Sequence, residues 1–262
     1  MSGWLVVTPT LGQSPWLDQT VASVAGLPRA CRHVLVCPTS ASADLERRFP
    51  HAQVVIEPGG GLYAAVNAGI AAAPDWDAFT YLNDDDVLCA DGTALAWQRL
   101  EQDPGAEVVY GKVSLMDAKG ACQGWLPVAH RPGDLGGLLA WGIVPLAQPG
   151  TWLRPALMKR LGGFDESFRL AGDLDCFSRA VAGGARFDFV PAEVARFRLH
   201  PGQLSKHEQA GEDEKARALT RWADAPRSVS SLLRFRRDNL PVYLDRVRRH
   251  GFVSMRRIYR GN

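Results

Sequence analysis

Short apolar segments alternate with segments of helical periodicity over residues 4–110, and no other feature constrains the fold as much. The apolar segments, which we expect to be buried strands, cover residues 4–8, 33–36, 53–56, 78–82 and 107–110. Apolar residues between them recur at helical spacing and predict helices over residues 15–25, 42–49, 62–70 and 94–100. Strands that alternate with helices pair through right-handed crossovers. The sequence therefore predicts an α/β fold with a Rossmann-like, mostly parallel sheet flanked by helices.

The second half of the chain follows a different pattern. Residues 112–125 read as a hairpin that turns at Ala118-Lys119-Gly120. Helices are expected over residues 155–161 and 173–181, and short strands over residues 187–190 and 194–197. Polar residues take over near residues 205–213, so we expect one domain over residues 1–205 and a separate tail over residues 206–262.

Charge is distributed unevenly along the 262 residues. Hydrophobic residues make up 46% and charged residues 22%, so the chain has an ordinary globular composition rather than a disordered one. Residues 227–262 contain ten arginines against Asp238 and Asp245, a formal charge of +8; since the whole chain is +2, residues 1–226 carry −6. An acidic body does not indicate a nucleic-acid-binding domain, whereas the basic tail indicates a partner of its own.

The cysteines and the hydropathy suggest where the chain works. There are five cysteines and no C-x-x-C pair, so neither a disulfide framework nor a zinc site is indicated, and a reducing cytoplasm is expected. The first residues do not resemble a signal peptide. No apolar run reaches the roughly 18–20 residues of a membrane span. We expect a soluble protein, or one that lies on a membrane without crossing it.

Three consecutive carboxylates, Asp84, Asp85 and Asp86, follow the expected strand at residues 78–82, directly after Asn83. In an open α/β sheet, ligands bind at the carboxyl ends of the strands. Neighbouring carboxylates repel one another unless a cation or hydrogen-bond donors neutralise them. Oxygen ligands suit Mg²⁺ or Mn²⁺, which often share their coordination with substrate phosphates. The run is equally compatible with a metal site and with a solvated acidic turn.

Two further segments carry candidate residues. Asp173 lies at an expected helix start, where a carboxylate acts either as a cap or as a general base for an incoming hydroxyl. His200 follows an expected strand and precedes a Pro-Gly turn. A histidine there is a surface residue, a metal ligand or a phosphate contact. Taken alone, each segment favours the structural role.

The third expected helix opens after Gly59-Gly60-Gly61. Helix amino ends attract phosphate, but the segment has neither the P-loop nor the dinucleotide-binding pattern and is better interpreted as a turn. Tyr63 and Asn67 are polar positions on that helix and either line a site or face solvent. Together these signals, with carboxylates for a divalent metal, a phosphate-bearing ligand and a separate carboxylate base, indicate a transferase with a phosphate leaving group.

Four segments, in one order along the chain, resemble family 2 glycosyltransferases of the GT-A fold, in the branch that builds bacterial polysaccharides. Each is moderately specific, and the resemblance covers roughly residues 4–205, most of the chain. They are the Tyr-containing helix at residues 61–70, a D-x-D region at residues 81–86, the acidic segments at residues 162–166 and 171–175, and a closing His segment at residues 197–205.

The resemblance implies inverting transfer of a sugar from a nucleotide-diphosphate donor to a saccharide or lipid-linked glycan acceptor. Residues 1–112 would form the nucleotide-binding half and residues 113–205 the acceptor half. Asp173 would be the general base, and Mg²⁺ or Mn²⁺ would be held by Asp86 with Asp84 and His200. The donor would contact Thr8, Pro9, Thr10, Thr39, Tyr63, Asn67, Asp84 and Asp85, and the acceptor would lie near Trp125, Gln148, Thr151, Trp152 and Asp175.

The sequence departs from that pattern after the second strand. Relatives commonly carry an acid there that contacts the nucleotide, whereas this chain has Cys37-Pro38-Thr39-Ser40. A non-catalytic glycan- or nucleotide-binding relative with a degenerate donor site is therefore the alternative function. A sugar-phosphate nucleotidyltransferase would need basic residues after the first strand, and residues 8–14 contain no Lys or Arg. Trp125, Trp141 and Trp152 either stack on sugars or pack in the core, and we expect at least one to be core.

The tail combines its ten arginines with regularly spaced apolar residues, which predicts a basic amphipathic helix pair. Pro241 and Gly251 exclude one long helix. Three roles remain open for these helices: binding to anionic lipid at the inner face of the cytoplasmic membrane, packing on the body, or a dimer contact. The oligomeric state is not predicted.

Overall fold

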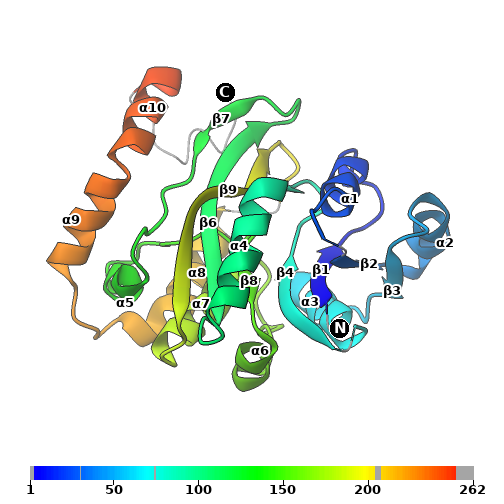
Figure 1. Ribbon diagram of the computed structural model, residues 1–262, viewed down its shortest axis with the longest axis horizontal. Helices are drawn as coiled ribbons and strands as arrows, with labels where there is room; N and C mark the ends of the chain where they lie inside the picture. Colours follow the sequence, from blue (N-terminus) through cyan, green and yellow to red (C-terminus); the bar gives the residue numbers. More distant parts are fainter. Residues whose placement is uncertain (1–2, 30, 74, 204–207, 252–262) are drawn as a thin grey trace.

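One nine-stranded sheet runs through the molecule, with helices packed on both of its faces (Figure 1). The computed structural model describes residues 3–29, 31–73, 75–203 and 208–251. The strand order is β3-β2-β1-β4-β8-β6-β9-β5, and β7 pairs with β6. This is the expected α/β architecture, and it ends in a helical C-terminal region.

The first part of the chain forms the expected alternation of strands and helices. Its elements are β1 (Gly3–Pro9), α1 (Leu17–Ala25), β2 (Cys31–Cys37), α2 (Thr39–Arg48), β3 (Gln53–Ile56), α3 (Leu62–Ala71), β4 (Trp76–Tyr81), β5 (Val87–Leu88) and α4 (Ala90–Gln102). Strands β3, β2, β1 and β4 pair in parallel, with Val7 of β1 opposite Val34 of β2 and Tyr81 of β4. Buried residues dominate β1 and β2, as expected for strands covered by helices on both faces.

The second part adds the expected hairpin and further short elements. These are β6 (Val108–Asp117), β7 (Cys122–Trp125), the 3₁₀ turn η1 (Pro132–Asp134), α5 (Leu135–Ala140), β8 (Trp152–Leu153), α6 (Pro155–Leu161), α7 (Gly172–Ala182), β9 (Phe187–Leu199), α8 (Glu208–Leu219), the 3₁₀ turn η3 (Thr220–Trp222), α9 (Val229–Asp238) and α10 (Leu240–His250).

Strand pairing is parallel in the first part of the sheet, as expected, and mixed in the second part, where the sequence predicts a hairpin. Strand β8 lies antiparallel between β4 and β6, and β5 and β7 also pair antiparallel with their neighbours. Of the later strands in the described ranges, only β9 pairs in parallel, along β6. The mixture follows from the local connections: a hairpin and two-residue strands replace the helical crossovers that parallel pairing needs.

Several predicted element boundaries differ from the structure. Helix α2 begins at Thr39, with Pro38 as its N-cap, rather than at Ser42. The two strands expected over residues 187–190 and 194–197 are one continuous strand, β9, which includes Pro191. The register with β6 shifts between Tyr110 and Lys112, opposite this proline. Proline donates no ladder hydrogen bond, and a bulge lets the strand continue past it.

The core contains a cluster of three tryptophans on one side of the sheet. Trp4 stacks on Trp97 with ring centroids 4.6 Å apart, and Trp152 meets both rings edge-on. Trp152 is fully buried. The sequence-based placement of Trp152 at an acceptor site is therefore wrong, and the core interpretation of at least one tryptophan is confirmed.

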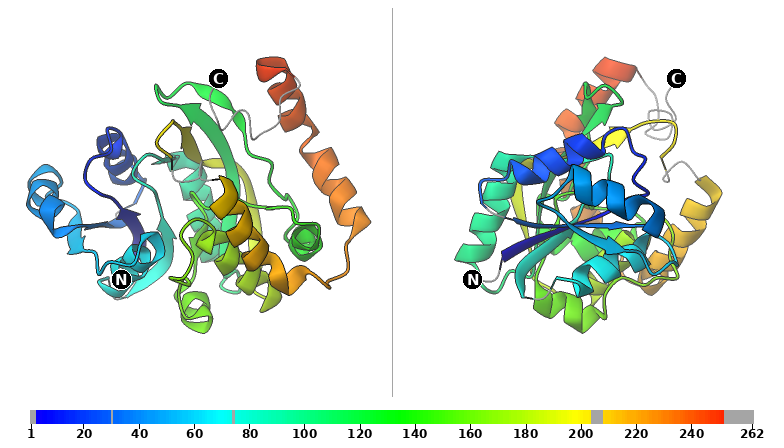
Figure 2. Two further views of the ribbon diagram at one scale, coloured as in Figure 1. Left: turned by 180° about the vertical axis from the view of Figure 1, so that it is seen from behind. Right: turned by 90° about the vertical axis from the view of Figure 1, so that its right-hand side faces the viewer.

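The C-terminal helices pack on the body, and Figures 1 and 2 show α9 and α10 along one edge of the molecule. Asn239, between α9 and α10, is fully buried; its side chain accepts a hydrogen bond from the Val128 N–H at 3.0 Å and donates one to the Val128 carbonyl at 2.9 Å. Arg234 forms an ion pair with the buried Asp134. Packing on the body is thus confirmed for α9 and α10. The expected domain boundary at residue 205 and residues 252–262 of the tail lie outside the described residues.

None of the described helices combines the length and the apolar character needed to cross a bilayer.

Candidate active site

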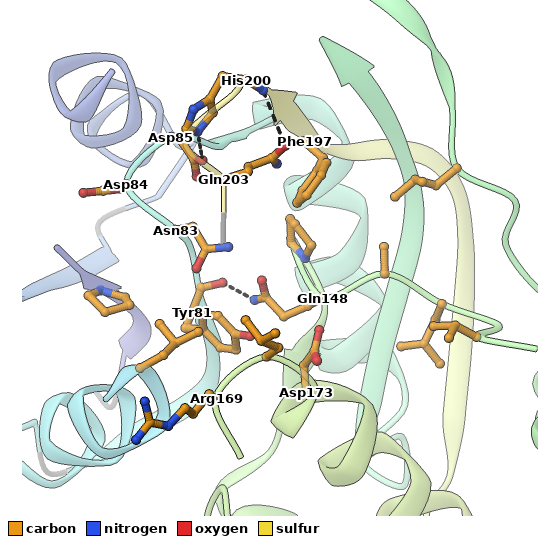
Figure 3. Close-up of a pocket in the computed structure, with 18 of the residues that line it drawn as sticks. Tyr81, Asn83, Asp84, Asp85, Gln148, Arg169, Asp173, Phe197, His200 and Gln203 are labelled. Atoms are coloured by element: carbon orange, nitrogen blue, oxygen red, sulfur yellow. Dashed lines mark hydrogen bonds and ion pairs between the residues drawn. The ribbon is translucent and has the colours of Figure 1, made fainter. Parts of the chain in front are cut away.

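A cavity of about 1090 Å³ opens at the carboxyl ends of β1, β3 and β4 and extends to the C-terminal helices (Figure 3). The cavity is lined by residues from segments spread along the chain between Pro9 and Arg246. The lining residues include Pro9, Thr10, Trp16, Glu57, Tyr63, Asn83, Asp84, Asp85, Gln148, Arg169, Asp173, His200, Phe235, Arg236, Tyr243 and Arg246.

The acidic loop after β4 is fixed by hydrogen bonds to three successive carbonyls. Ser14 donates to the carbonyl of Asp84, Arg198 Nε to that of Asp85 at 2.7 Å, and Thr20 to that of Asp86 at 2.8 Å. Arg198 is itself buried, and its guanidinium also donates to Gln19 Oε1 at 2.8 Å. Elements far apart in the sequence therefore hold this loop in one conformation at the edge of the sheet.

The three carboxylates of the loop point in different directions, which relieves their mutual repulsion. Asp84 accepts a 2.5 Å hydrogen bond from the Thr10 hydroxyl, and Asp85 Oδ2 lies 2.8 Å from His200 Nε2. Asp86 is fully buried, and its Oδ1 accepts a hydrogen bond from the Arg198 backbone N–H at 2.8 Å. Burial raises the pKa of Asp84 to about 6, because the carboxylate is desolvated and lies beside that of Asp85.

The assignment of Asp86 as the principal metal ligand is not supported by this geometry. Asp86 does not line the cavity, and burial raises its pKa well above the usual range, with the Asp85 carboxylate adding to the shift. A carboxyl in that position supports the fold of the loop. The residues of this region that reach the cavity are Asn83, Asp84 and Asp85.

Asp85 and His200 form the pair that a metal could use. Their side chains are 15% and 13% exposed and both line the cavity, and the Trp16 ring packs against His200 with centroids 4.4 Å apart. Among the described residues, no three His, Cys, Asp or Glu side chains converge on one point. Two protein ligands are still sufficient for Mg²⁺ or Mn²⁺ where substrate phosphates and water complete the coordination.

Asp173 lies in the other part of the cavity, at the first turn of α7 (Figure 3). Its Oδ1 accepts a hydrogen bond from the Leu174 N–H at 2.8 Å, and the Tyr63 hydroxyl lies 3.4 Å from the same oxygen. The Tyr63 hydroxyl also accepts the Asp173 N–H at 3.2 Å. A Cβ on Gly172 would lie 2.6 Å from the Tyr63 ring, so glycine is needed for this close packing. Burial raises the Asp173 pKa to about 6, the range of a general base.

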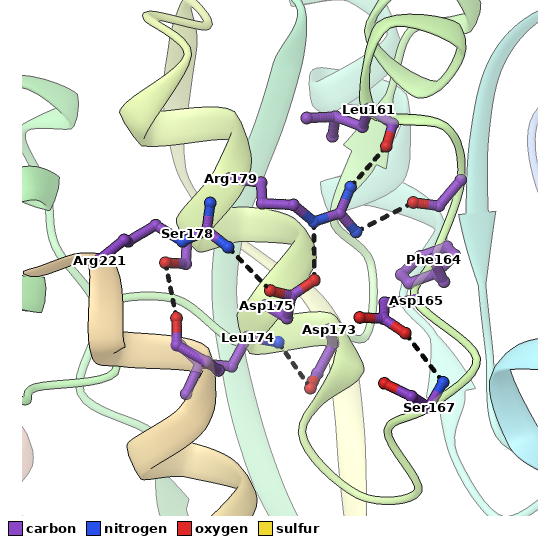
Figure 4. A network of polar contacts seen from close by, with 12 residues as sticks. Leu161, Phe164, Asp165, Ser167, Asp173, Leu174, Asp175, Ser178, Arg179 and Arg221 are labelled. Carbon is purple, nitrogen blue, oxygen red and sulfur yellow. Dashed lines mark hydrogen bonds and ion pairs between the residues drawn. The ribbon is translucent and has the colours of Figure 1, made fainter.

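Asp175, expected near the acceptor, has a structural role instead (Figure 4). It is buried and forms ion pairs with Arg179 at 2.7 Å and Arg221 at 3.1 Å, joining α7 to the C-terminal region. Arg179 also donates to the carbonyls of Leu161 and Gly163. The network positions α7, and hence Asp173, but Asp175 does not line the cavity.

The residues expected at the nucleotide divide into two groups. Pro9, Thr10, Tyr63, Asp84 and Asp85 line the cavity, whereas Thr8, Thr39 and Asn67 do not. Thr8 is buried against His33, with 2.9 Å between its hydroxyl and His33 Nε2. Thr39 is exposed at the start of α2. Asn67 holds the loop at Phe164 by accepting from its N–H and donating to its carbonyl.

Of the five residues expected near the acceptor, Gln148 lines the cavity and the other four do not. Gln148 lines the cavity and donates to the Tyr81 carbonyl (Figure 3). Thr151 is buried and donates to the Ala147 carbonyl at 2.6 Å. Trp125 lies half-buried on β7, and Trp152 is in the core, as described above. The side chains of Trp125, Thr151 and Trp152 do not line the cavity.

Several residues that line the cavity were not predicted from the sequence. Glu57 follows β3 and gave no signal beyond its place at the carboxyl end of a strand, and Arg169 lies in an irregular loop. Arg236, Tyr243 and Arg246 belong to the tail, which sequence reasoning treated as a separate segment. Because α9 and α10 fold back onto the body, they form one wall of the cavity.

Comparisons with known proteins define the fold. No protein-family model matches the sequence, and no curated protein matches it. Solved structures do match: S. aureus TarS (14% identity, TM-score 0.62), TarS 1–349 with UDP (15%, 0.62) and TarS 1–349 with UDP-GlcNAc (16%, 0.63). Each alignment covers 97% of this chain, and it covers 44% of the first TarS chain and 76% of each of the other two. The chain thus spans less than half of the longest of these neighbours.

At these identities the likeness shows the fold. The mixed α/β sheet with flanking helices and a helical C-terminal end matches glycosyltransferase structures, and the chain has a glycosyltransferase fold. The particular structures that it resembles here are those of S. aureus TarS, two of which were solved with UDP or UDP-GlcNAc.

Proposed function

We propose that this chain is an inverting glycosyltransferase that moves a sugar from a nucleotide-diphosphate donor to a saccharide or lipid-linked glycan acceptor in cell-surface polysaccharide assembly. One observation carries the proposal: a single cavity holds Asp84, Asp85 and His200 in one part and the Asp173 carboxylate in another (Figure 3). The UDP and UDP-GlcNAc bound to S. aureus TarS support a nucleotide-sugar donor. The proposal includes a cytoplasmic location, because the chain carries no paired-cysteine pattern.

The donor nucleotide would lie at the carboxyl ends of β1 and β3, beside Pro9, Thr10 and Tyr63. Glu57 lines the cavity there, and its N–H donates to the Cys37 carbonyl at 2.8 Å. This carboxylate therefore stands next to the place where relatives carry an acid and this chain does not. Glu57 favours a working donor site over a degenerate one.

The metal would be Mg²⁺ or Mn²⁺, held by Asp85 and His200 with Asp84 beside them. Burial, and after it the neighbouring Asp85 carboxylate, raises the pKa of Asp84, and a cation beside this carboxylate would favour its charged form. When bound, such a cation offsets the charge that develops on the leaving diphosphate.

Asp173 is the proposed general base. Its carboxylate takes the proton of the acceptor hydroxyl while the acceptor oxygen bonds to the anomeric carbon and the bond from that carbon to the diphosphate breaks. Attack from the face opposite the leaving group inverts the configuration. The Tyr63 hydroxyl and the Leu174 N–H hold the carboxylate in position for this transfer.

The charged and apolar lining of the cavity supports an acceptor with both anionic and apolar parts. Arg169, Arg236 and Arg246 line the cavity together with apolar side chains, among them Leu232 and Phe235. Guanidinium groups suit phosphate, and the apolar surface suits a hydrocarbon chain or sugar faces. A lipid-linked glycan has this combination.

The test is the stereochemistry of turnover. We expect the chain, given UDP-sugars with α-configured anomeric carbons and a glycan acceptor, to release UDP and form a β-linked product, followed by NMR. Asp173→Asn should lower kcat by about 10²-fold or more, as for the loss of a general base. Asp165→Asn is the matched control, because Asp165 is exposed and does not line the cavity.

The alternative is a protein that binds a nucleotide or glycan without turning it over. This alternative is supported by residues 37–40, which lack the acidic residue that relatives commonly carry there. Tight nucleotide binding with no release from any UDP-, GDP-, dTDP- or CMP-linked donor would favour it and count against the transferase.

A further inference from the structure

We propose that the outer face of α9 and α10 docks on an anionic lipid membrane. Four large apolar side chains project from this face: Val229, Leu233, Leu240 and Leu244 are 58%, 61%, 52% and 60% exposed. We call them the outer stripe. They recur at intervals of four and seven residues, so they fall on one side of the two successive helices.

The inner face of the same helices is anchored, and this fixes which side points outward. Phe235 and Ser231 are buried, Ser231 donates to Asp134 at 2.8 Å, and Asn239 binds the Val128 backbone. At the end of α10, His250 Nε2 lies 2.9 Å from the Gln123 carbonyl. The outer stripe is therefore the face that these contacts leave uncovered within the described residues.

Arginines flank the outer stripe. Arg236, Arg237 and Arg248 are exposed on the same two helices. Residues 229–250 contain six arginines against two aspartates, and the sequence continues with Arg256, Arg257 and Arg260. An exposed apolar stripe edged by arginine is the pattern of a helix that lies in the interface of an anionic bilayer.

A second copy of this chain fits the face less well. In a twofold dimer the same patch meets itself, so the flanking arginines of one copy would face those of the other. Like charges across an interface disfavour association, whereas lipid phosphates neutralise them. Charge complementarity thus favours a bilayer as the occupant.

Docking would bring the cavity close to the bilayer. Leu232, Phe235, Tyr243 and Arg246 line the cavity from these helices, whereas the four side chains of the outer stripe are exposed and do not line it. The inference does not depend on the proposed function, since it concerns adhesion of the chain to lipid without donor or acceptor.

The experiment is co-sedimentation of the full chain with vesicles of phosphatidylcholine alone, or of phosphatidylcholine mixed with phosphatidylglycerol. We expect binding to the mixed vesicles only, weakened by added salt as screening increases. Leu233→Asn with Leu244→Asn should lower the vesicle partition by about tenfold or more. Leu95→Asn, which changes a 45% exposed leucine on α4, is the matched control and should bind like the unchanged chain.

Several outcomes would overturn the proposal: no binding to anionic vesicles, equal binding by the double variant, or a sedimenting mass that the double variant converts from dimer to monomer. Hydrogen exchange on the unchanged chain gives a test that does not depend on variants folding. Amides of residues 229–250 should exchange more slowly with anionic vesicles than without them, and unchanged exchange there would contradict docking.

Discussion

At the scale of single residues, the four aspartates of the site differ through their immediate partners. Asp85 meets His200 in the cavity, Asp84 meets Thr10, and Asp86 turns into the protein to bind the Arg198 backbone. Asp173 is held by Tyr63 and by the first turn of α7. Asp84, Asp85 and Asp86 are adjacent, yet they have separate roles because each contacts a residue more than 70 positions away in the sequence.

Burial of Asp173 predicts a cost to stability at neutral and higher pH. Its pKa is about 6 in the folded chain, against an ordinary value of 3.8, so ionisation opposes folding. The cost is fully present above about pH 6 and disappears as the pH falls toward the unfolded value. We expect Asp173→Asn to be more stable than the unchanged chain by about 1–3 kcal/mol at about pH 8.

Urea unfolding at a series of pH values measures this difference. The difference in the free energy of unfolding between the two proteins should disappear near pH 4. If this difference is absent at pH 8, or if it grows in acid, Asp173 is not desolvated. Together with the loss of turnover, greater stability would identify a carboxylate kept for chemistry rather than for the fold.

Sequence reasoning at this scale found the right types of residue and misjudged several directions. Asp85, His200 and Asp173 lie in one cavity as expected. Asp86 was expected to hold the metal and does not line the cavity, because the orientation of a side chain within an acidic run depends on Arg198, which is remote in sequence. Thr8 was expected at the donor nucleotide but does not line the cavity, because its hydroxyl lies against His33.

At the scale of elements, the helices and strands of the first part were predictable because their hydrophobic periodicity is strong. The short strands β5 and β8 have two residues each and leave no periodic signal. Strand β9 was divided in two because proline usually interrupts strands, and only the bulge opposite β6 shows how it continues. The docking of α9 and α10 was one of three open alternatives, since amphipathicity does not identify the surface that a helix covers.

Asn239 holds the α9–α10 pair on the body, and its removal should be costly. Asn239→Ala would leave the N–H and carbonyl of Val128 buried without these partners. We expect a loss of about 2–4 kcal/mol in the free energy of unfolding, measured in urea. Asn239→Asp should cost at least as much, because it would place a buried carboxylate against the Val128 carbonyl oxygen.

Arg237→Ala is the control on the same helix pair, because Arg237 is exposed and pairs only with its neighbour Asp238 in the described contacts. It should change stability by less than about 0.5 kcal/mol. If Asn239→Ala proved as mild as Arg237→Ala, the helices would not be anchored through Val128.

At the scale of the whole molecule, the fold forms one cavity from segments that are far apart in the sequence. The carboxyl ends of β1, β3 and β4 supply the expected donor side, α7 supplies Asp173, and α9 and α10 close the far wall. The fold class could be predicted from sequence because alternating elements determine it. The wall that α9 and α10 form could not be predicted, because it depends on contacts between residues more than 100 positions apart.

The most direct test of the central claim is a thermal-shift titration with UDP, GDP, dTDP and CMP, each with Mn²⁺, Mg²⁺ or EDTA. We predict that one nucleoside diphosphate stabilises the chain only when metal is present, by roughly 2.7 kcal/mol at a hundred times its Kd. Asp85→Asn should abolish the shift and Asp165→Asn should keep it. A chain that none of these ligands stabilises, or that binds equally in EDTA and with Asp85→Asn, would contradict a metal-assisted nucleotide-sugar transferase.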